Sequence, residues 1–355
     1  MQYLRLLLLP LSIVYGLIVW LRNKLYDVGV FKSQTFNLPI ICIGNLAIGG
    51  AGKTPMAEYL IRLLKDTHKV AVLSRGYKRK TSGFKLVEKT DTLFEAGDEP
   101  LQYRNKFENI TVAVSEKRAI GIEALKNNHE VIILDDAFQH RAVQAGLSIL
   151  LFDYTRLNDH LVILPAGNLR ESFSNRKRAD IIVISKCPES LGDPEKRKLE
   201  KRIKPFKHQQ LFFSFLEYES LIPVSRYPAK TLAEIKDSTV LLLTGIANPH
   251  PLLSKLRTVT ASIIHHDYPD HHPFSQKNMI KLVEEFNECD AVNKLIITTE
   301  KDIQRLQEPA LLELLKDLPV YYLPVRAKIH QPDEQRFNNL IENYASTYLH
   351  HNGIH

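Results

Sequence analysis

A glycine-rich segment near residue 50 carries the residue types that bind the phosphates of a nucleotide. Over residues 44–55 it reads Gly-Asn-Leu-Ala-Ile-Gly-Gly-Ala-Gly-Lys-Thr-Pro. Glycines let successive backbone N–H groups turn toward one anion, while Lys53 can reach phosphate oxygens and the Thr54 hydroxyl can bind Mg²⁺. Ala47 stands where the strict pattern G-x-x-x-x-G-K-[ST] has its first glycine. The predicted phosphate-binding residues are Gly49, Gly50, Ala51, Gly52, Lys53, Thr54 and Pro55.

A pair of aspartates supplies the acidic partner that such a loop requires. Asp135 and Asp136 directly follow the apolar run 131–134, which is typical of a buried strand. An acid at the carboxyl end of a strand can hold a phosphate-bound Mg²⁺ directly or through water. We therefore expect a metal site at Thr54, Asp135 and Asp136. The alternative is that the two acids only cap the following turn.

The segments around the loop predict the elements that position it. Residues 39–44 are a short β-branched run typical of a parallel strand, and residues 55–64 carry helical periodicity behind a proline that suits a first turn. Strand, loop and helix in this order favour phosphate binding over a glycine turn that merely caps a helix. Further apolar runs with polar residues at their carboxyl ends predict a parallel α/β sheet with ligands at the strand ends. These runs are 70–74, 147–152, 181–184, 240–243 and 295–297.

Two other classes of P-loop protein are disfavoured. Partition-type ATPases have a lysine where this chain has Ile48. GTPases need an Asn-Lys-x-Asp guanine reader, but Asn293 and Lys294 are followed by two apolar residues. No base-reading motif is visible, so the sequence does not select the nucleotide base.

Length and composition limit the class of protein. The chain has 355 residues with 44% hydrophobic and 25% charged side chains, which is ordinary globular composition and suggests two domains. The net charge of +7 favours an anionic partner: a phosphate ligand, an anionic membrane or nucleic acid. Three scattered cysteines make a disulfide framework unlikely and indicate a reducing compartment.

The N-terminal segment predicts an association with a membrane. Residues 6–21 contain no charge, and Arg5, Arg22 and Lys24 flank them. As a helix this run would extend ~24 Å, short of the ~30 Å hydrocarbon core, so it could span a thinned bilayer or lie in the interface. A buried core helix and a signal peptide are the alternatives, although no small-residue cleavage site follows the run.

The middle of the chain suggests a domain boundary. Prolines punctuate a basic stretch at 195–202, whose ordinary interpretation is a solvated helix face, and residues 211–218 and 220–227 could form a two-stranded link. We expect an anchor helix at 1–25, a P-loop domain at 26–210, a β linker at 211–230 and a smaller α/β domain at 231–355.

Taken in order, these motifs resemble the tetraacyldisaccharide 4′-kinases, the membrane-associated kinases of lipid A biosynthesis. The resemblance extends from the N-terminal apolar helix to about residue 305. The segments that carry it, besides residues 44–55, are Leu73–Tyr77, Gly97–Pro100, Leu134–His140, Leu164–Glu171, Thr244–Pro249, Asp270–His272 and Thr298–Asp302. The chain departs from the family at Ala51, Ala137 and Asn168, where threonine, glycine and proline are common, and none of these changes removes a charged group.

The resemblance implies a fold, a reaction and a location. The fold is a P-loop α/β/α domain with a second, smaller α/β domain and an N-terminal membrane-associated helix. The reaction transfers the γ-phosphate of ATP, with Mg²⁺, to the 4′-hydroxyl of a tetraacylated glucosamine disaccharide 1-phosphate. It takes place at the cytoplasmic face of the bacterial inner membrane. The implied partners are the lipid substrate and the membrane surface, not nucleic acid.

The resemblance also implies roles for individual residues. Asp98 would act as the base, assisted by His271, and the two are so far apart in sequence that they would have to meet across a domain cleft. Domain closure would then complete the site. Lys53 and Arg170 join the catalytic set. The expected substrate-binding residues are Arg75, Tyr77, Glu99, Arg118, Gln139, His140, Arg170 and Glu171.

Two rival functions remain open at this level. The first is a membrane-associated P-loop ATPase switch that hydrolyses ATP without a lipid acceptor. The second is a metal-binding module built on the histidine-rich stretch 265–272, although its potential ligands are adjacent rather than set at helical spacing.

Overall fold

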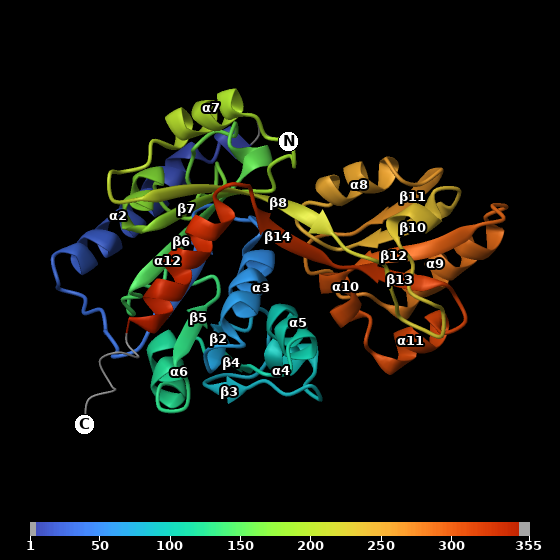
Figure 1. Cartoon of the computed structure of the whole chain (residues 1–355), viewed down its shortest axis with the longest axis horizontal. Coiled ribbons are helices and arrows are strands. Elements are labelled where there is room, and N and C mark those ends of the chain that lie inside the picture. Colours follow the sequence, from blue (N-terminus) through green and yellow to red (C-terminus); the bar gives the residue numbers. More distant parts are fainter. Residues whose placement is uncertain (1–4, 348–355) are drawn as a thin grey trace.

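The computed structural model describes residues 5–347, and within this range the chain forms a nine-stranded and a five-stranded sheet that lie side by side (Figure 1). The ends of the expected anchor and of the expected C-terminal domain, residues 1–4 and 348–355, lie outside the described residues. The fold class predicted from the sequence is confirmed: both sheets are mainly parallel and helices cover their faces.

The larger sheet is built around the strand that precedes the glycine-rich loop. Its order is β14-β8-β7-β6-β1-β5-β2-β4-β3, with only the edge strands β3 and β14 antiparallel to their neighbours. The strands are β1 (Ile40–Asn45), β2 (Val70–Ser74), β3 (Lys85–Leu86), β4 (Thr111–Val114), β5 (Val131–Leu134), β6 (Leu147–Asp153), β7 (Ile181–Ser185), β8 (Gln210–Tyr218) and β14 (Val325–Ile329). β1, β2, β4, β5, β6 and β7 are mostly buried apolar runs, as parallel strands covered on both faces require.

Helices cover both faces of this sheet. One core contains side chains from α3 (Lys53–Leu64), α5 (Asp98–Lys106) and α12 (Glu334–Ser346). The opposite core contains side chains from α6 (Arg118–Leu125) and α7 (Asp193–Ile203). A one-turn helix, α4 (Leu93–Ala96), leads into α5. The loop after β1 therefore emerges at the carboxyl edge of a sandwich that is packed on both sides.

The smaller sheet has the order β11-β10-β12-β13-β9. The strands are β9 (Ile222–Pro223), β10 (Thr239–Thr244), β11 (Ser262–Asp267), β12 (Lys294–Thr299) and β13 (Val320–Leu323), and only β9 is antiparallel to its neighbour. Its helices are α8 (His250–Arg257), α9 (Gln276–Glu288), α10 (Glu300–Arg305) and α11 (Pro309–Leu315). α9 and α11 pack on one face and α8 packs on the other.

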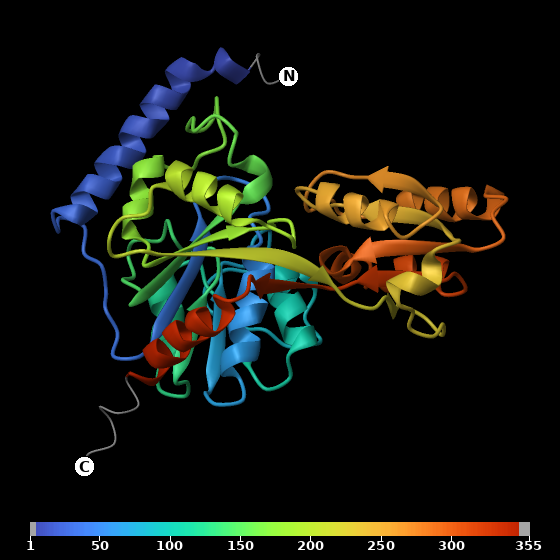
Figure 2. The same cartoon turned by 45° about the horizontal axis from the view of Figure 1, so that its top comes forward.

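Two antiparallel strands join the two bodies and correct the expected domain boundaries. β8 pairs with β7 on one side and with β14 on the other, so residues 211–218 of the expected β linker form a strand of the larger sheet. β14 and α12 return from the smaller body to the larger one (Figures 1 and 2). The reason is packing: Phe337 and Ile341 of α12 are buried in the same core as α3. The expected unit 231–355 therefore contains a C-terminal part that completes the P-loop domain.

The N-terminal helix α2 (Leu9–Asp27) lies along the outside of the larger body (Figure 2). No helix in the described range 5–347 is both long and apolar enough to cross a membrane. The helix has an inverted polarity, because its buried residues are polar and its apolar side chains are exposed. Ser12 and Asn23 are buried, whereas Ile13, Leu17 and Ile18 are each more than 60% exposed.

We expect Phe337→Ala to lower the free energy of unfolding by about 4 kcal/mol, the usual cost of emptying a buried phenylalanine site. The Phe337 ring is fully buried and packs edge-on against Tyr59 and Phe212. Chemical denaturation would measure the change. Gln335→Ala, on the exposed side of the same helix, serves as the control and should change stability by about 0.5 kcal/mol or less. Equal stability of the two variants would contradict the assignment of α12 to the larger core.

Candidate active site at the carboxyl edge of the larger sheet

The loop between β1 and α3 has the backbone shape of an anion cradle. Gly49 has φ 103° and Gly52 has φ 80°, a left-handed region that favours glycine, and Gly52 immediately precedes the first turn of α3. The end of β7 holds the loop from behind. The Ser185 hydroxyl donates to the Ala51 carbonyl at 2.7 Å, and the Lys186 ammonium donates to the carbonyl of Gly50. The loop thus has the rigidity that a phosphate site needs.

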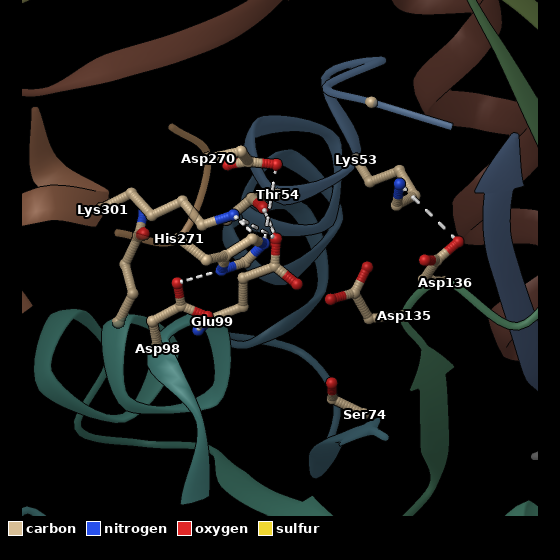
Figure 3. Close-up of polar contacts among 12 residues, drawn as sticks. Lys53, Thr54, Ser74, Asp98, Glu99, Asp135, Asp136, Asp270, His271 and Lys301 are labelled. Atoms are coloured by element: carbon tan, nitrogen blue, oxygen red, sulfur yellow. Dashed lines mark hydrogen bonds and ion pairs between the residues drawn. The ribbon is translucent and has the colours of Figure 1, made fainter. Parts of the chain in front are cut away.

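Lys53, Asp136 and Arg170 form one charged cluster in front of this loop. The Lys53 ammonium lies 3.6 Å from Asp136 Oδ1 and 3.3 Å from Asn45 Oδ1 (Figure 3). Arg170 Nη1 donates to both carboxylate oxygens of Asp136 at 3.0 Å. Burial alone would raise the pKa of Asp136, but Lys53 and Arg170 outweigh burial and hold that pKa below its ordinary value. Asp136 is therefore an ionised acid that faces the loop.

Asp135 lies deeper and is in the opposite electrostatic state. Its side chain is buried, and its Oδ2 accepts a hydrogen bond from the Tyr103 hydroxyl at 3.1 Å. Its Oδ1 is buried with no hydrogen-bond partner among residues 5–347. Burial, together with the charges of Glu99 and Asp136, raises the pKa of Asp135 to about 7. A buried carboxylate oxygen that receives no hydrogen bond from the described part of the chain suits a cation or a cation-bound water.

The start of α5 meets the loop after β11 across the boundary between the two bodies. His271 Nδ1 lies 2.7 Å from Asp98 Oδ2, so the pair expected from the resemblance is in hydrogen-bond contact (Figure 3). Beside it, Lys301 of α10 donates to Glu99 Oε1 at 3.1 Å, and Thr54 Oγ1 donates to the same Glu99 oxygen at 3.3 Å. A continuous line of contacts therefore connects the glycine-rich loop to the smaller body through Glu99.

Of the other residues expected to bind substrate, Arg75 and Tyr77 are exposed, whereas His140 and Arg118 are partly or fully buried. Arg75 and Tyr77 are exposed near this edge, and the Tyr77 ring centroid lies 5.0 Å from that of His271. His140 is half-buried, and burial together with Arg118 and Arg75 lowers its pKa to about 4. Arg118 is only 2% exposed and donates to the Asp135 carbonyl at 3.4 Å, which places it behind the acid rather than on the surface.

Glu171 is the centre of a buried hydrogen-bond network. The residue is fully buried and its carboxylate accepts hydrogen bonds from Asn23, Gln139, Asn175 and Arg178 at 2.5–3.0 Å. Gln139 also donates to the Asn45 carbonyl at 2.9 Å, at the end of β1. Glu171 and Gln139 therefore support the site from within, and neither side chain is fully open to a ligand.

Sequence reasoning missed several residues of this site. Tyr103 and Asn23 lie in no recognisable motif. Only the fold brings Tyr103 to Asp135 and Asn23 to Glu171. Lys301 lies inside a motif that carried the resemblance, but no role was assigned to it. Arg305 lies three residues beyond that motif and donates to Asp98 Oδ2 at 2.6 Å.

The histidine-rich stretch does not converge on one point. His265 contacts the Thr244 hydroxyl, His266 contacts Glu285, and His272 contacts Asn278. Within residues 5–347, no three His, Cys, Asp or Glu side chains are grouped so that they could hold a metal ion by themselves.

Comparison with known proteins identifies what the chain is similar to. Residues 4–346 match the family model described as tetraacyldisaccharide-1-P 4′-kinase. The tetraacyldisaccharide 4′-kinase of Bacteroides thetaiotaomicron is 44% identical over 95% of this chain and 92% of its own length. That of Flavobacterium psychrophilum is 43% identical over 98% of both chains. A crystal structure of LpxK from Aquifex aeolicus in complex with ATP is similar with a TM-score of 0.72 and 31% identity, covering 96% of this chain and 99% of that one.

The two neighbouring aspartates should respond in opposite ways to replacement by asparagine. Because the pKa of Asp135 is raised above its unfolded value near ~4, folding takes up a proton between pH ~4 and about 7, and this contribution to stability is lost as pH rises through that window. In magnesium-free buffer at pH 8 we therefore expect Asp135→Asn to raise Tm. Asp136→Asn should lower Tm, because it leaves Lys53 and Arg170 without their anion. Thermal unfolding at pH 5 and 8 measures both. Equal shifts of one sign would contradict the assignment.

Proposed function

The chain belongs to the tetraacyldisaccharide-1-phosphate 4′-kinase family, the kinases of lipid A biosynthesis, and from that premise we propose that its phosphoryl transfer takes place between the β1–α3 loop and the Asp98–His271 pair. One observation carries the proposal. Thr54 of the loop and Lys301 of the smaller body both contact Glu99, the residue next to Asp98. The phosphate cradle and the proton-accepting pair therefore face the same space.

ATP is the proposed phosphate donor. The LpxK of Aquifex aeolicus has been crystallised with ATP, and this chain resembles it over nearly its whole length. The backbone N–H groups of residues 49–54 and the N-terminus of α3 would bind the phosphate tail. Lys53 would leave Asp136 for the β- and γ-phosphate oxygens, where its charge neutralises the transferring group.

Mg²⁺ is the proposed metal, and the residues present fit it. A hard cation of this size takes oxygen ligands and keeps several waters, so one or two carboxylates and a hydroxyl suffice. Thr54, Asp136 and the unpaired oxygen of Asp135 would hold the ion or its waters. When bound, the ion neutralises negative charge on the phosphates.

The sugar acceptor would enter from the side of the smaller body. The Asp98–His271 pair takes the proton of the 4′-hydroxyl, and the exposed Arg75 and Tyr77 beside it are suited to bind the disaccharide and its 1-phosphate. Arg170, next to Asp136, adds positive charge near the transferring group. His140 completes this set as a neutral hydrogen-bonding group. The two bodies are joined by β8 and β14, which would allow them to close on the substrate.

The membrane is the proposed location of the reaction, at the cytoplasmic face of the bacterial inner membrane. The polar face of α2 packs against the larger body, where Tyr15 donates to the Arg170 carbonyl and Asn23 donates to Glu171. Its apolar face is left outside, in the orientation of a helix embedded in an interface. The acyl chains of the lipid substrate would then stay in the bilayer while its sugar reaches the site. We assign the net positive charge to phosphate ligands and anionic lipid, not to nucleic acid.

Lys53→Ala should lower kcat/KM for phosphate transfer to the lipid disaccharide at least about 100-fold, the scale of losing one preorganised charge contact to the transition state. Transfer from radiolabelled ATP in detergent micelles would measure it. Lys65→Ala, at the far end of α3 in a surface pair with Asp66, is the control and should retain full activity. Undiminished transfer by Lys53→Ala would disprove the proposed phosphate site.

A second variant separates this function from the ATPase switch. If Asp98→Ala hydrolysed ATP at the wild-type rate and neither protein transferred phosphate to the lipid, the ATPase switch would be favoured.

Replacing Ile13 and Ile18 together by glutamate should abolish sedimentation with vesicles that contain anionic phospholipid. Both side chains are on the exposed apolar face of α2, where a charge opposes insertion into the interface. Ile280→Glu, at an equally apolar exposed position on α9, is the matched control and should sediment like wild type. If the α2 variant still sediments, the membrane contact lies elsewhere.

A further inference from the structure

A second charged cluster at the boundary between the two bodies has no part in the proposed reaction. The Lys106 ammonium, at the end of α5, lies 2.7 Å from Glu58 Oε2 of α3 and 2.6 Å from Glu300 Oε1 of α10. The same three helices supply the proposed site with side chains from their first turns. One ammonium group therefore links all three helices.

α10 faces α5 with two rows of side chains, and the proposed site uses only one of them. The two helices lie against each other (Figure 1). Lys301 and Arg305, four residues apart, contact the start of α5. The other row, Glu300 and Gln304, contacts its end, where Gln304 Oε1 accepts from Asn105 Nδ2 at 2.8 Å. Residues at this spacing lie on one side of a helix, so the second row is a separate contact between the two bodies.

The larger body holds the Lys106 ammonium in place for Glu300. Glu58 is only 1% exposed, and besides Lys106 its carboxylate accepts from Gln102 Nε2 at 2.9 Å and from Arg62 Nη2 at 3.0 Å. All of these partners belong to α3 and α5, so their contacts do not depend on the smaller body. Glu58, Lys106 and Arg62 together carry one net positive charge, which a carboxylate from the smaller body neutralises.

We propose that Glu58, Lys106 and Glu300 form a latch that seats the smaller body on the larger one, and that Lys106 is the positioning residue of this latch. When Glu300 binds Lys106, α10 is held along α5 and its next residue, Lys301, lies beside the site. The effect of the latch on phosphoryl transfer rests on the proposed function, whereas the seating of the two bodies does not.

Seating of the smaller body takes up a proton. Burial, followed by the charge of Glu58, raises the pKa of Glu300 to about 7, and Lys106 and Arg62 offset this only in part. Away from the larger body Glu300 regains water, and its pKa returns toward the ordinary value of 4.5. Because the seated pKa is the higher one, this contribution to seating is lost as pH rises through about 7. Tyr322 of β13 also lies within electrostatic reach, since burial and then Glu300 raise the pKa of its hydroxyl.

The latch predicts different effects for replacements of its members. Lys106→Met leaves the carboxylates of Glu58 and Glu300 facing each other without a cation between them, so we expect the bodies to separate. Glu300→Gln keeps an oxygen that accepts from Lys106 but carries no charge, so seating should become independent of pH. Added to Lys106→Met, it removes the repulsion and should restore most of the seating. Arg104→Met is the matched control, because that cation is on the same helix and pairs with Glu88 of the larger body.

Seating can be measured without turnover, as a distance between the two bodies. Nitroxide labels are attached to Thr90→Cys in the larger body and Lys277→Cys in the smaller one, both exposed positions, in the full chain with Cys289→Ser and in detergent micelles. Pulsed electron–electron double resonance gives the distribution of label distances at pH 6 and pH 8. We expect one short distance in the labelled parent at pH 6 and a longer component that increases at pH 8. Glu300→Gln should keep the short distance at both pH values, and Lys106→Met should show mainly the longer one.

Equal distributions for the labelled parent and Lys106→Met would overturn the latch, and so would an equally large shift in Arg104→Met. Glu300→Lys covers the case in which Lys106→Met does not fold. It changes only the smaller body and places two ammonium groups together, so it should also separate the bodies. Unchanged distances in Glu300→Lys would likewise contradict the inference.

Phosphorylation assays then test whether seating positions the site. Lys106→Met should lower kcat for lipid phosphorylation about tenfold with little change in KM for ATP, the scale of a small misplacement of reacting groups. Adding Glu300→Gln should recover most of this loss. A loss that is not recovered would leave Lys106 with a structural role only and refute its positioning role. Absence of any lipid transfer by wild type would refute the proposed function, whereas the distances would still decide the latch.

Discussion

The site depends on cations and hydrogen-bond donors that compensate the negative charge of desolvated carboxylates. The buried Asp98 and Asp135 and the partly buried Asp136 lie at one edge of the larger sheet, and a carboxylate removed from water is costly unless a cation or a hydrogen-bond donor pairs with it. Lys53 pairs with Asp136 from within the loop, and Arg305 pairs with Asp98 from the other body. Asp135 alone among these three keeps an oxygen without a partner within the described residues, and burial together with the charges of Glu99 and Asp136 raises its pKa. The electrostatic imbalance of the edge is therefore concentrated where we propose the metal.

The same requirement explains why the smaller body docks where it does. Its α10 contributes the cations that the start of α5 lacks, so the interface between the bodies is also half of the proposed site. On the opposite side, α2 reaches the edge through Asn23, which donates to the buried Glu171. Glu171 orients Gln139, and Gln139 contacts Arg170, the partner of Asp136. The helix that we place at the membrane thus belongs to the hydrogen-bonded framework of the site and is not a detachable tether.

What the sequence predicted, and what it could not, follows from how far apart the interacting residues are. The loop at Lys53 and the acids at 135–136 were predictable because strand, turn and ligand residues are consecutive, and local backbone geometry fixes their direction. The Asp98–His271 contact came only from the family resemblance, since nothing local relates two residues 173 positions apart. Nothing near Asn23 in the sequence indicates a role, because its buried partner Glu171 is brought to it only by the fold. The return of β14 to the larger sheet was not predicted for a similar reason. A short edge strand forms only because a neighbouring strand, here β8, pairs with it.

The two members of the Asp98–His271 pair differ in the number of donors around their polar atoms. A carboxylate that accepts from an arginine, an imidazole and a backbone N–H is stabilised as an anion, and each of those bonds must weaken before it can be protonated. Nε2 of His271 lies 3.3 Å from the Lys301 ammonium, which also donates to Glu99 at 3.1 Å, and 3.8 Å from Asp270 Oδ2. The carboxylate of Asp98 is therefore held more firmly than Nε2 of His271, whose contacts are fewer and longer.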